Sequence, residues 1–190
     1  MSKSAAQYIA NGLPVSLRSV LIVAGGVMLT TLSAKVQIPF WPVPMNLQTM
    51  AVMGFAIGFG PRLAVAIFAA YLAAGAFGLP VFAGAPERGI GIAYLIGPTG
   101  GYLAGMLAAS WMTGVLGAGR GLIGRAAATL AGIAVIYALG TLWLALYIPS
   151  SQLLMKGILP FILADLVKVG IVAAGASLAS GLRRPVKSTD

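Results

Sequence analysis

Two oppositely charged residues, Asp165 and Lys168, stand three positions apart in the last long apolar run of the chain. Residues three apart share one face of a helix, which places Phe161 one turn before the pair and Val172 one turn after it. A carboxylate accepts hydrogen bonds and an ammonium group donates them, so this face could bind a polar solute. The alternative is an ion pair that neutralises itself between helices and fixes their packing.

A second group of polar residues follows the proline-rich segment 38–44. Asn46, Gln48 and Thr49 offer donors and acceptors at the start of an apolar helix, and a helix N-terminus favours anionic or carbonyl groups. The prolines stiffen the approach to this helix, which suits a loop that forms the lid or wall of a cavity. Trp41 in the same segment could contact a ligand or anchor the chain at a membrane interface.

The composition predicts how these residues are carried. The chain has 190 residues, of which 59% are hydrophobic and 8% are charged, and its mean hydropathy is +0.99. One core covered by a polar surface cannot accommodate that balance, so the sequence predicts an integral membrane protein. The apolar runs are too long and too little alternating for barrel strands, so the spans should be helices.

The composition also excludes several kinds of site. The chain has no Cys and no His, which removes disulfides, thiolate or imidazole metal sites and catalysis by either residue. The net charge of +9 comes from Lys and Arg residues that stand singly at the ends of apolar runs and do not form a basic stripe. We therefore expect no nucleic-acid partner.

Apolar runs bounded by Gly, Pro or charge predict an all-α bundle of six transmembrane helices, in one membrane domain over residues 1–190. The predicted spans are Val15–Leu32, Met45–Phe59, Pro61–Gly78, Gly97–Leu116, Ala126–Ile148 and Ile158–Leu182. Residues from about 15 to 182 would be embedded, between short tails at 1–14 and 183–190. The second span is only about 22 Å long, so it should lean on other helices.

The positive charges predict the orientation, because an even number of spans places both termini on one side. The terminus side carries Lys3, Arg18, Arg62, Arg120, Arg125, Arg183, Arg184 and Lys187. The opposite side carries Lys35, Arg88 and Lys156, while Lys168 lies within a span. Both termini are therefore predicted to be cytoplasmic, with segments 38–44 and 79–96 outside.

An alternative interpretation takes Lys3 and the apolar run 20–32 as a cleaved signal peptide. The proline-rich segment follows that run directly, where a secreted protein would begin a soluble domain, so we favour a membrane span.

Two further patterns concern helix packing. Gly97–Tyr102 is a loop-to-helix entry that lacks the preceding strand and the Lys of a phosphate-binding loop, so we expect no nucleotide site in this chain. Gly26 and Thr30, four apart in the first span, form a small-residue face that could pack within the bundle or against a partner protein.

Several segments together resemble the BioY family, whose members are biotin-binding S components of energy-coupling-factor transporters. They are Pro-Val-Pro-x-x-x-Gln-Thr (42–49), Tyr71 with Gly-Ala-Phe-Gly-Leu-Pro-Val-Phe-Ala-Gly (75–84), Gly-Pro-Thr-Gly-Gly-Tyr-Leu-Ala-Gly (97–105) and Pro-Phe-x-x-x-Asp-x-x-Lys (160–168). The position of Asn46 is usually Thr in that family, and the segment Ala85–Gly91 is more charged than the usual glycine-rich link.

The resemblance implies a six-helix S component in the bacterial cytoplasmic (inner) membrane that captures biotin from outside. It implies partners that use ATP, namely a transmembrane T component and two cytoplasmic ATPases, and no cofactor or catalysis in this chain. The substrate-binding residues that we expect are Asp165, Lys168, Gln48, Thr49, Asn46, Phe82, Tyr94, Tyr102 and Trp41.

Other functions stay open at this point. The chain could bind another vitamin, such as thiamine or riboflavin, or act as a biotin facilitator without ATPase partners, alone or as a homo-oligomer. A membrane enzyme could use the acid and the base of the last span for proton transfer. In a purely structural subunit the same pair would only fix packing.

Overall fold

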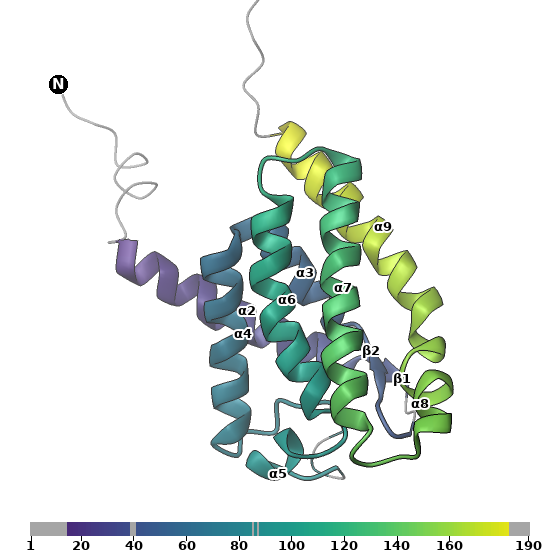
Figure 1. The fold of residues 1–190 in the computed structure, drawn as a ribbon. Coiled ribbons are helices and arrows are strands. Elements are labelled where there is room, and N and C mark those ends of the chain that lie inside the picture. Colours follow the sequence, from purple (N-terminus) through teal and green to yellow (C-terminus); the bar gives the residue numbers. More distant parts are fainter. Residues whose placement is uncertain (1–14, 39–40, 85, 87, 183–190) are drawn as a thin grey trace, which may run out of the picture.

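The computed structural model describes residues 15–38, 41–84, 86 and 88–182. Within these ranges the chain is helical except for one short two-stranded ribbon (Figure 1). The long helices are α2 (Val15–Lys35), α3 (Gln48–Phe59), α4 (Pro61–Ala76), α6 (Gly100–Gly117), α7 (Leu122–Leu144) and α9 (Leu159–Leu182). The predicted tails 1–14 and 183–190, with Lys3, Arg183, Arg184 and Lys187, lie outside the described residues.

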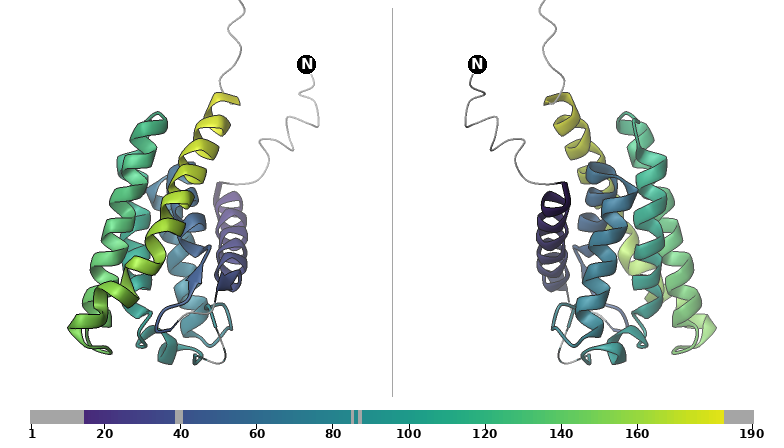
Figure 2. Two further views of the ribbon diagram at one scale, coloured as in Figure 1. Left: turned by 90° about the vertical axis from the view of Figure 1, so that its right-hand side faces the viewer. Right: turned by 90° about the vertical axis from the view of Figure 1, so that its left-hand side faces the viewer.

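The long helices form a bundle in which α3 lies near the centre. Helix α3 contacts α2, α4, α6, α7 and α9, and α6 packs most extensively against α7. Figure 2 shows α2 at one edge of the bundle and α7 toward the other. Each predicted span therefore coincides with one long helix, although the boundaries differ.

The predicted second span begins differently from our expectation. Met45 and Asn46 form strand β2 (Met45–Asn46), which pairs antiparallel with β1 (Gln37–Ile38), and α3 begins only at Gln48. The backbone N–H of Leu47 also donates to the carbonyls of Ser33 and Val36, so the loop folds back onto the end of α2. The 12 residues of α3 span about 18 Å, so this helix is a short stub, as predicted.

Two short helices were not predicted, α5 (Ile92–Leu95) and α8 (Ser150–Gly157). The chain leaves helical geometry at Ile158, where φ is −129° and ψ is −60°, and α9 then begins at Leu159. Pro160 lies in the first turn of α9, where its missing N–H leaves no hydrogen bond unmade. Helix α8 consequently stands as a separate turn before the last long helix.

Close approach of α6 and α7 depends on small residues. A side chain at Gly105 would place its first carbon 2.8 Å from the Cα of Ile136, and one at Gly140 would lie 2.3 Å from the ring of Tyr102. Gly26 packs inside the bundle in the same way, because an added carbon would lie 2.7 Å from the side chain of Ile67. Thr30 is fully buried and donates to the Gly26 carbonyl. This face therefore serves packing within the bundle.

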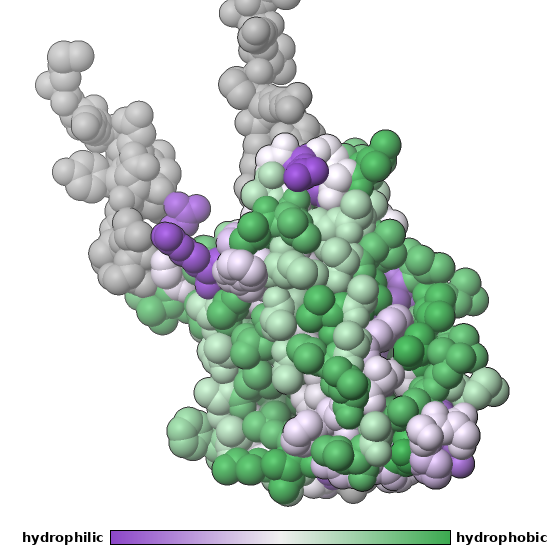
Figure 3. All heavy atoms as spheres, in the orientation of Figure 1, coloured by the Kyte–Doolittle hydropathy of each residue, from purple (hydrophilic) through white to green (hydrophobic). Residues whose placement is uncertain are grey.

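The surface of the bundle is largely apolar. Figure 3 shows hydrophobic residues over most of the visible face, with strongly hydrophilic residues near its two ends. Three segments are long and apolar enough to cross a membrane, by length and composition, within the described residues: Leu17–Lys35, Leu122–Leu144 and Ser150–Leu178. Helices α3 and α4 are shorter apolar helices. A soluble monomer rarely exposes so much apolar surface, so this surface fits a lipid environment.

Candidate functional site

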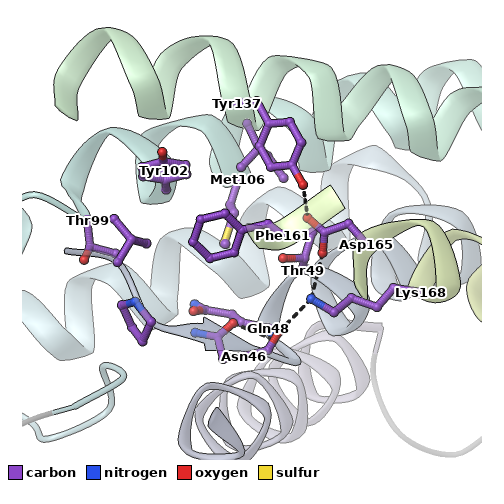
Figure 4. Close-up of a pocket in the computed structure, with 13 residues that line it drawn as sticks. Asn46, Gln48, Thr49, Thr99, Tyr102, Met106, Tyr137, Phe161, Asp165 and Lys168 are labelled. Carbon is purple, nitrogen blue, oxygen red and sulfur yellow. Dashed lines mark hydrogen bonds and ion pairs between the residues drawn. The ribbon is translucent and has the colours of Figure 1, made fainter. Parts of the chain in front are cut away.

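A small cavity of about 40 Å³ lies between α3, α6, α7 and α9, and the end of the proline-rich segment lies over it. Figure 4 shows the side chains around it. The lining residues are Val43, Pro44, Asn46, Gln48, Thr49, Thr99, Tyr102, Met106, Ile136, Tyr137, Phe161, Asp165 and Lys168. Helices that are far apart in the sequence therefore contribute to one site.

Asp165 and Lys168 form an ion pair at one side of this cavity. The Lys168 Nζ lies 2.7 Å from the Asp165 Oδ1, and the two residues are 9% and 5% exposed. Their spacing of three on α9 directs both side chains to the face that meets α3 and α7, as the sequence predicted. Phe161 lies on the same face one turn earlier and also lines the cavity.

Each partner of the ion pair has a further hydrogen bond. The Tyr137 hydroxyl of α7 donates to the Asp165 Oδ2 at 2.6 Å, and the Lys168 ammonium group donates to the Asn46 carbonyl at 2.8 Å. Figure 4 shows these contacts as one continuous chain from α7 through α9 to the β2 strand. Such partners make a buried charged pair tolerable in an apolar bundle.

Asn46 has two roles in the structure. Its backbone carbonyl accepts from Lys168, and its side-chain Oδ1 accepts from the backbone N–H of Gln48 at 3.0 Å. The second bond satisfies a donor in the first turn of α3, which has no other side-chain cap. Asn46 therefore ties the start of α3 to the ion pair of α9.

Gln48 and Thr49 lie in the first turn of α3 and line the cavity. Gln48 is 2% exposed, and its Nε2 has no hydrogen-bond partner among the described residues. A buried amide donor without a partner is unfavourable by about 1–3 kcal/mol, and such groups usually have an unseen ligand or water. The Nε2 of Gln48 is thus a donor available to whatever occupies the cavity.

Tyr102 lines the cavity from α6 and fixes the start of the last helix. Its hydroxyl donates to the Gly157 carbonyl at 2.8 Å, just before the break between α8 and α9. Its ring packs against Phe161 with a centroid distance of 6.3 Å. Figure 4 places Tyr102 and Thr99 on the side of the cavity away from the ion pair.

Three of the predicted binding residues do not line this cavity. Phe82 and Tyr94 are buried and stack on each other at 4.7 Å, in the core beside Tyr71. Trp41 is 67% exposed, and the guanidinium carbon of Arg88 lies 5.9 Å from the centre of its ring. The structure therefore brings Asn46, Gln48, Thr49, Tyr102, Asp165 and Lys168 together and places the other three behind or outside the cavity wall.

Two cations connect the segments that lie above the cavity. Arg88 donates to the Pro42 carbonyl at 2.9 Å, and Lys35 at the end of α2 donates to the Phe82 carbonyl at 2.8 Å. The charged segment around Arg88 thus binds the proline-rich segment, whose Val43 and Pro44 line the cavity. These contacts explain how the two predicted outward loops hold each other in place.

Sequence reasoning missed several lining residues, of which Tyr137 is the most consequential. It lies in the middle of α7 among apolar residues, without a charged neighbour to mark it. A hydroxyl in an apolar helix needs a partner, and that requirement was the available signal. The others are Val43, Pro44, Thr99, Met106 and Ile136.

The site combines buried donors, a buried acceptor and apolar walls. That mixture suits a small molecule that carries hydrogen-bonding groups on an otherwise apolar body. Pockets for such ligands usually measure about 300–1,000 Å³, whereas this cavity holds about 40 Å³. The structure therefore shows a contracted state that must widen to admit such a ligand.

Comparison with known proteins identifies several similar chains. The model of the BioY family matches residues 3–186. The probable biotin transporter BioY of Pyrococcus horikoshii is 38% identical over 151 residues, covering 80% of this chain and 89% of its own. The biotin transporter BioY of Thermotoga maritima is 35% identical over 147 residues, covering 76% and 85%. The Rhodobacter capsulatus biotin transporter BioY is 39% identical over 158 residues, covering 69% and 77%.

One solved structure resembles the whole fold. It is the crystal structure of the S-component for biotin from an ECF-type ABC transporter, with a TM-score of 0.74 and coverage of 95% of both chains. The two sequences are 22% identical, so this match concerns the fold.

Proposed function

The chain belongs to the BioY family, and from this premise we propose that it is the membrane subunit that captures biotin from the outside and delivers it across the membrane. The observation that supports this most strongly is the buried Asp165–Lys168 pair beside a cavity, because its relatives are biotin transporters and the cavity offers groups complementary to biotin. The chain itself catalyses no reaction in this proposal.

The chemistry of biotin matches the cavity group by group. Biotin has a ureido ring with N–H donors and a carbonyl acceptor, a thioether ring, an aliphatic chain and a carboxylate. Asp165 can accept from N–H groups, while Lys168 and the free Nε2 of Gln48 can donate to oxygen. The Tyr102 and Phe161 rings can cover the apolar remainder. Asn46 and Thr49 complete the proposed polar contacts.

The remaining predicted residues have a supporting place in this proposal. Phe82 and Tyr94 lie behind the present wall, in the segment that Lys35 fixes, and Trp41 lies on the outer loop. Widening of the cavity by movement of these loops would bring their rings closer to the ligand. Their role as walls of the occupied site is therefore part of the proposal.

We propose that all six long helices lie in the membrane, with both termini cytoplasmic. The distribution of charge supports this, because Arg18, Arg62 and Arg120 belong to one end of the bundle while Lys35 and Lys156 belong to the other (Figure 1). A transmembrane T component and two cytoplasmic ATPases would supply the energy of ATP hydrolysis in a bacterial inner membrane. A biotin facilitator without these partners, including a homo-oligomer, is the alternative.

The direct test is binding of labelled biotin to the purified full-length protein in lipid nanodiscs. We expect saturable binding that unlabelled biotin displaces and that an excess of thiamine or riboflavin does not. Displacement by either of those vitamins, with biotin ineffective, would assign the chain to another vitamin.

Uptake by cells distinguishes the two modes of transport. Cells that express the chain together with a T component and ATPases should accumulate biotin, and inactive ATPases should abolish this. Equal accumulation with inactive ATPases would support the facilitator instead.

A further inference from the structure

A second hollow lies on the outside of the bundle, between α2 and α4, away from the ion pair. It has a volume of about 580 Å³. Its lining residues are Ser19, Val20, Val23, Ala24, Val27, Met28, Leu63, Ala66 and Ala70. We call this hollow the α2–α4 groove. Figures 1 and 2 show α2 at the edge of the bundle, with its first turns projecting beyond the other helices.

Small side chains produce the α2–α4 groove. Ala66 and Ala70 stand four apart on α4, and Ala24 lies on the facing side of α2. Deeper in the same contact, Gly26 meets the side chain of Ile67, which holds the two helices together. The groove is thus a shallow space beside a fixed helix contact.

Two arginines stand at one end of the α2–α4 groove. Arg18 precedes the lining residue Ser19, and Arg62 precedes the lining residue Leu63. Both helices start at this end of the bundle, so the two guanidinium groups belong to the same mouth of the groove (Figure 1).

The charge of these arginines is not balanced by the protein. Both side chains are exposed, and neither has an ion-pair or hydrogen-bond partner among the described residues. The chain contains three acidic residues in all, and Asp165, the one within the described ranges, is occupied by Lys168 and Tyr137. An anion from outside the chain is therefore the missing complement.

We propose that the α2–α4 groove binds one anionic phospholipid, with an acyl chain along the groove and the phosphate between Arg18 and Arg62. The lining of α2 extends over nine residue steps, about 13 Å, which accommodates much of an acyl chain. Arginine binds phosphate through parallel hydrogen bonds, and basic sites near the membrane surface favour anionic lipids.

A protein helix is the competing occupant, and the charges argue against it. A helix that filled the groove would also have to supply acidic groups opposite two arginines at its mouth. A phospholipid supplies the apolar chain and the negative charge in one molecule. This inference concerns a surface outside the biotin cavity and does not depend on the proposed function.

The test is a lipid competition in nanodiscs or detergent, followed by native mass spectrometry of the full-length chain. The protein is equilibrated with equal amounts of phosphatidylglycerol and phosphatidylethanolamine, and the retained ratio is measured. We expect selective retention of one phosphatidylglycerol molecule. Arg18→Gln and Arg62→Gln should each lower the ratio about fivefold.

Arg120→Gln is the matched control, because Arg120 is exposed at the same end of the bundle but lies outside the α2–α4 groove. It should leave the ratio unchanged. An equal loss with Arg120→Gln would show diffuse attraction to anionic lipid and would overturn the proposal. So would undiminished selectivity in the Arg18→Gln/Arg62→Gln double variant.

Filling the groove separates the lipid from a protein partner. Ala66→Phe should reduce retention of the bound phospholipid several-fold while leaving co-purification with T component and ATPases intact. Full lipid retention with loss of those partner proteins would overturn the proposal and assign the groove to a protein interface. Gly25→Ala, at a site with open space around it, is the control for folding of α2.

Discussion

At the residue scale, the polar side of the cavity is one connected network. Tyr137, Asp165, Lys168 and the Asn46 carbonyl form successive hydrogen bonds, so a change at one residue affects the others. The Nε2 of Gln48 stands beside this network without a partner. The network therefore holds the charges in the empty protein, and Gln48 provides unused capacity.

Tyr137→Phe tests the part of the network that sequence reasoning missed. The change removes the donor to the Asp165 Oδ2 and keeps the ring, so the carboxylate loses its orientation. We expect biotin affinity to fall about fivefold to tenfold, or about 1–1.4 kcal/mol. Calorimetric titration measures this effect.

The control for Tyr137→Phe is Tyr147→Phe, which removes a hydroxyl that donates to the Ile96 carbonyl at the end of α7, outside the cavity. It should leave affinity unchanged. Equal affinities in all three proteins would remove Tyr137 from the site.

Gln48→Met should change stability and binding in opposite directions. Methionine removes an unpartnered buried donor, so the ligand-free protein should gain up to about 1 kcal/mol in the free energy of unfolding. The same change removes a donor to the ligand, so biotin should bind at least fivefold more weakly. Thermal unfolding and titration measure the two effects.

Gln37→Met provides the comparison for Gln48→Met. The Oε1 of Gln37 is also buried without a partner, but Gln37 does not line the cavity. This variant should gain stability and keep its affinity. An affinity loss as large as that of Gln48→Met would argue against direct contact by Gln48.

The sequence identified part of the candidate site, and the reason is physical. Asp165, Lys168 and Gln48 are polar residues in or beside apolar helices, so their cost in a membrane marks them. Aromatic residues carry no such mark, since Phe82 and Tyr94 pack in the core while Tyr102 lines the cavity. Which aromatic ring faces the cavity depends on helix rotation, which composition does not encode.

At the element scale, the long helices followed from apolar runs bounded by Gly, Pro and charge. The β1–β2 ribbon and α8 did not, because each depends on contacts distant in the sequence. The ribbon is held by Leu47 bonding to the end of α2, and the break after α8 is held by Tyr102 bonding to Gly157. Local propensity gives little indication of either contact.

Gly105→Ala tests the close contact between α6 and α7 that places Tyr102 and Tyr137 opposite each other. The added carbon would lie 2.8 Å from the Ile136 Cα, and backbone cannot move aside cheaply. We expect a loss of about 1–3 kcal/mol in the free energy of unfolding. Unfolding in denaturant, followed by circular dichroism, measures it.

Gly170→Ala is the control for Gly105→Ala, because nothing lies within 4 Å of the added carbon in α9. Alanine favours helix, so this variant should be neutral or slightly more stable. If both variants lose the same stability, the α6–α7 contact is looser than the structure indicates.

At the scale of the whole molecule, the contracted cavity links binding to movement. A cavity of about 40 Å³ holds only water-sized guests, so biotin must separate the segments that Arg88 and Lys35 connect above it. The ion pair remains buried throughout in a bundle that exposes apolar surface to lipid. Its retention in such a small protein is best explained by use in binding.

A charge-neutral double variant separates binding from packing. Removing one charge alone leaves the other buried and unpaired, which could unfold the protein for a trivial reason. Asp165→Asn together with Lys168→Met removes both charges, so the bundle should fold about as well as the natural chain. Any loss of binding in this variant then belongs to the ligand.

The decisive measurement is therefore a biotin titration of purified Asp165→Asn/Lys168→Met beside the unmodified protein, with equal helix content verified for both. We predict that the double variant binds biotin about tenfold to hundredfold more weakly, a loss of about 1–3 kcal/mol. Unchanged affinity in the folded double variant would show that the pair only fixes packing and would contradict its assignment to the biotin site.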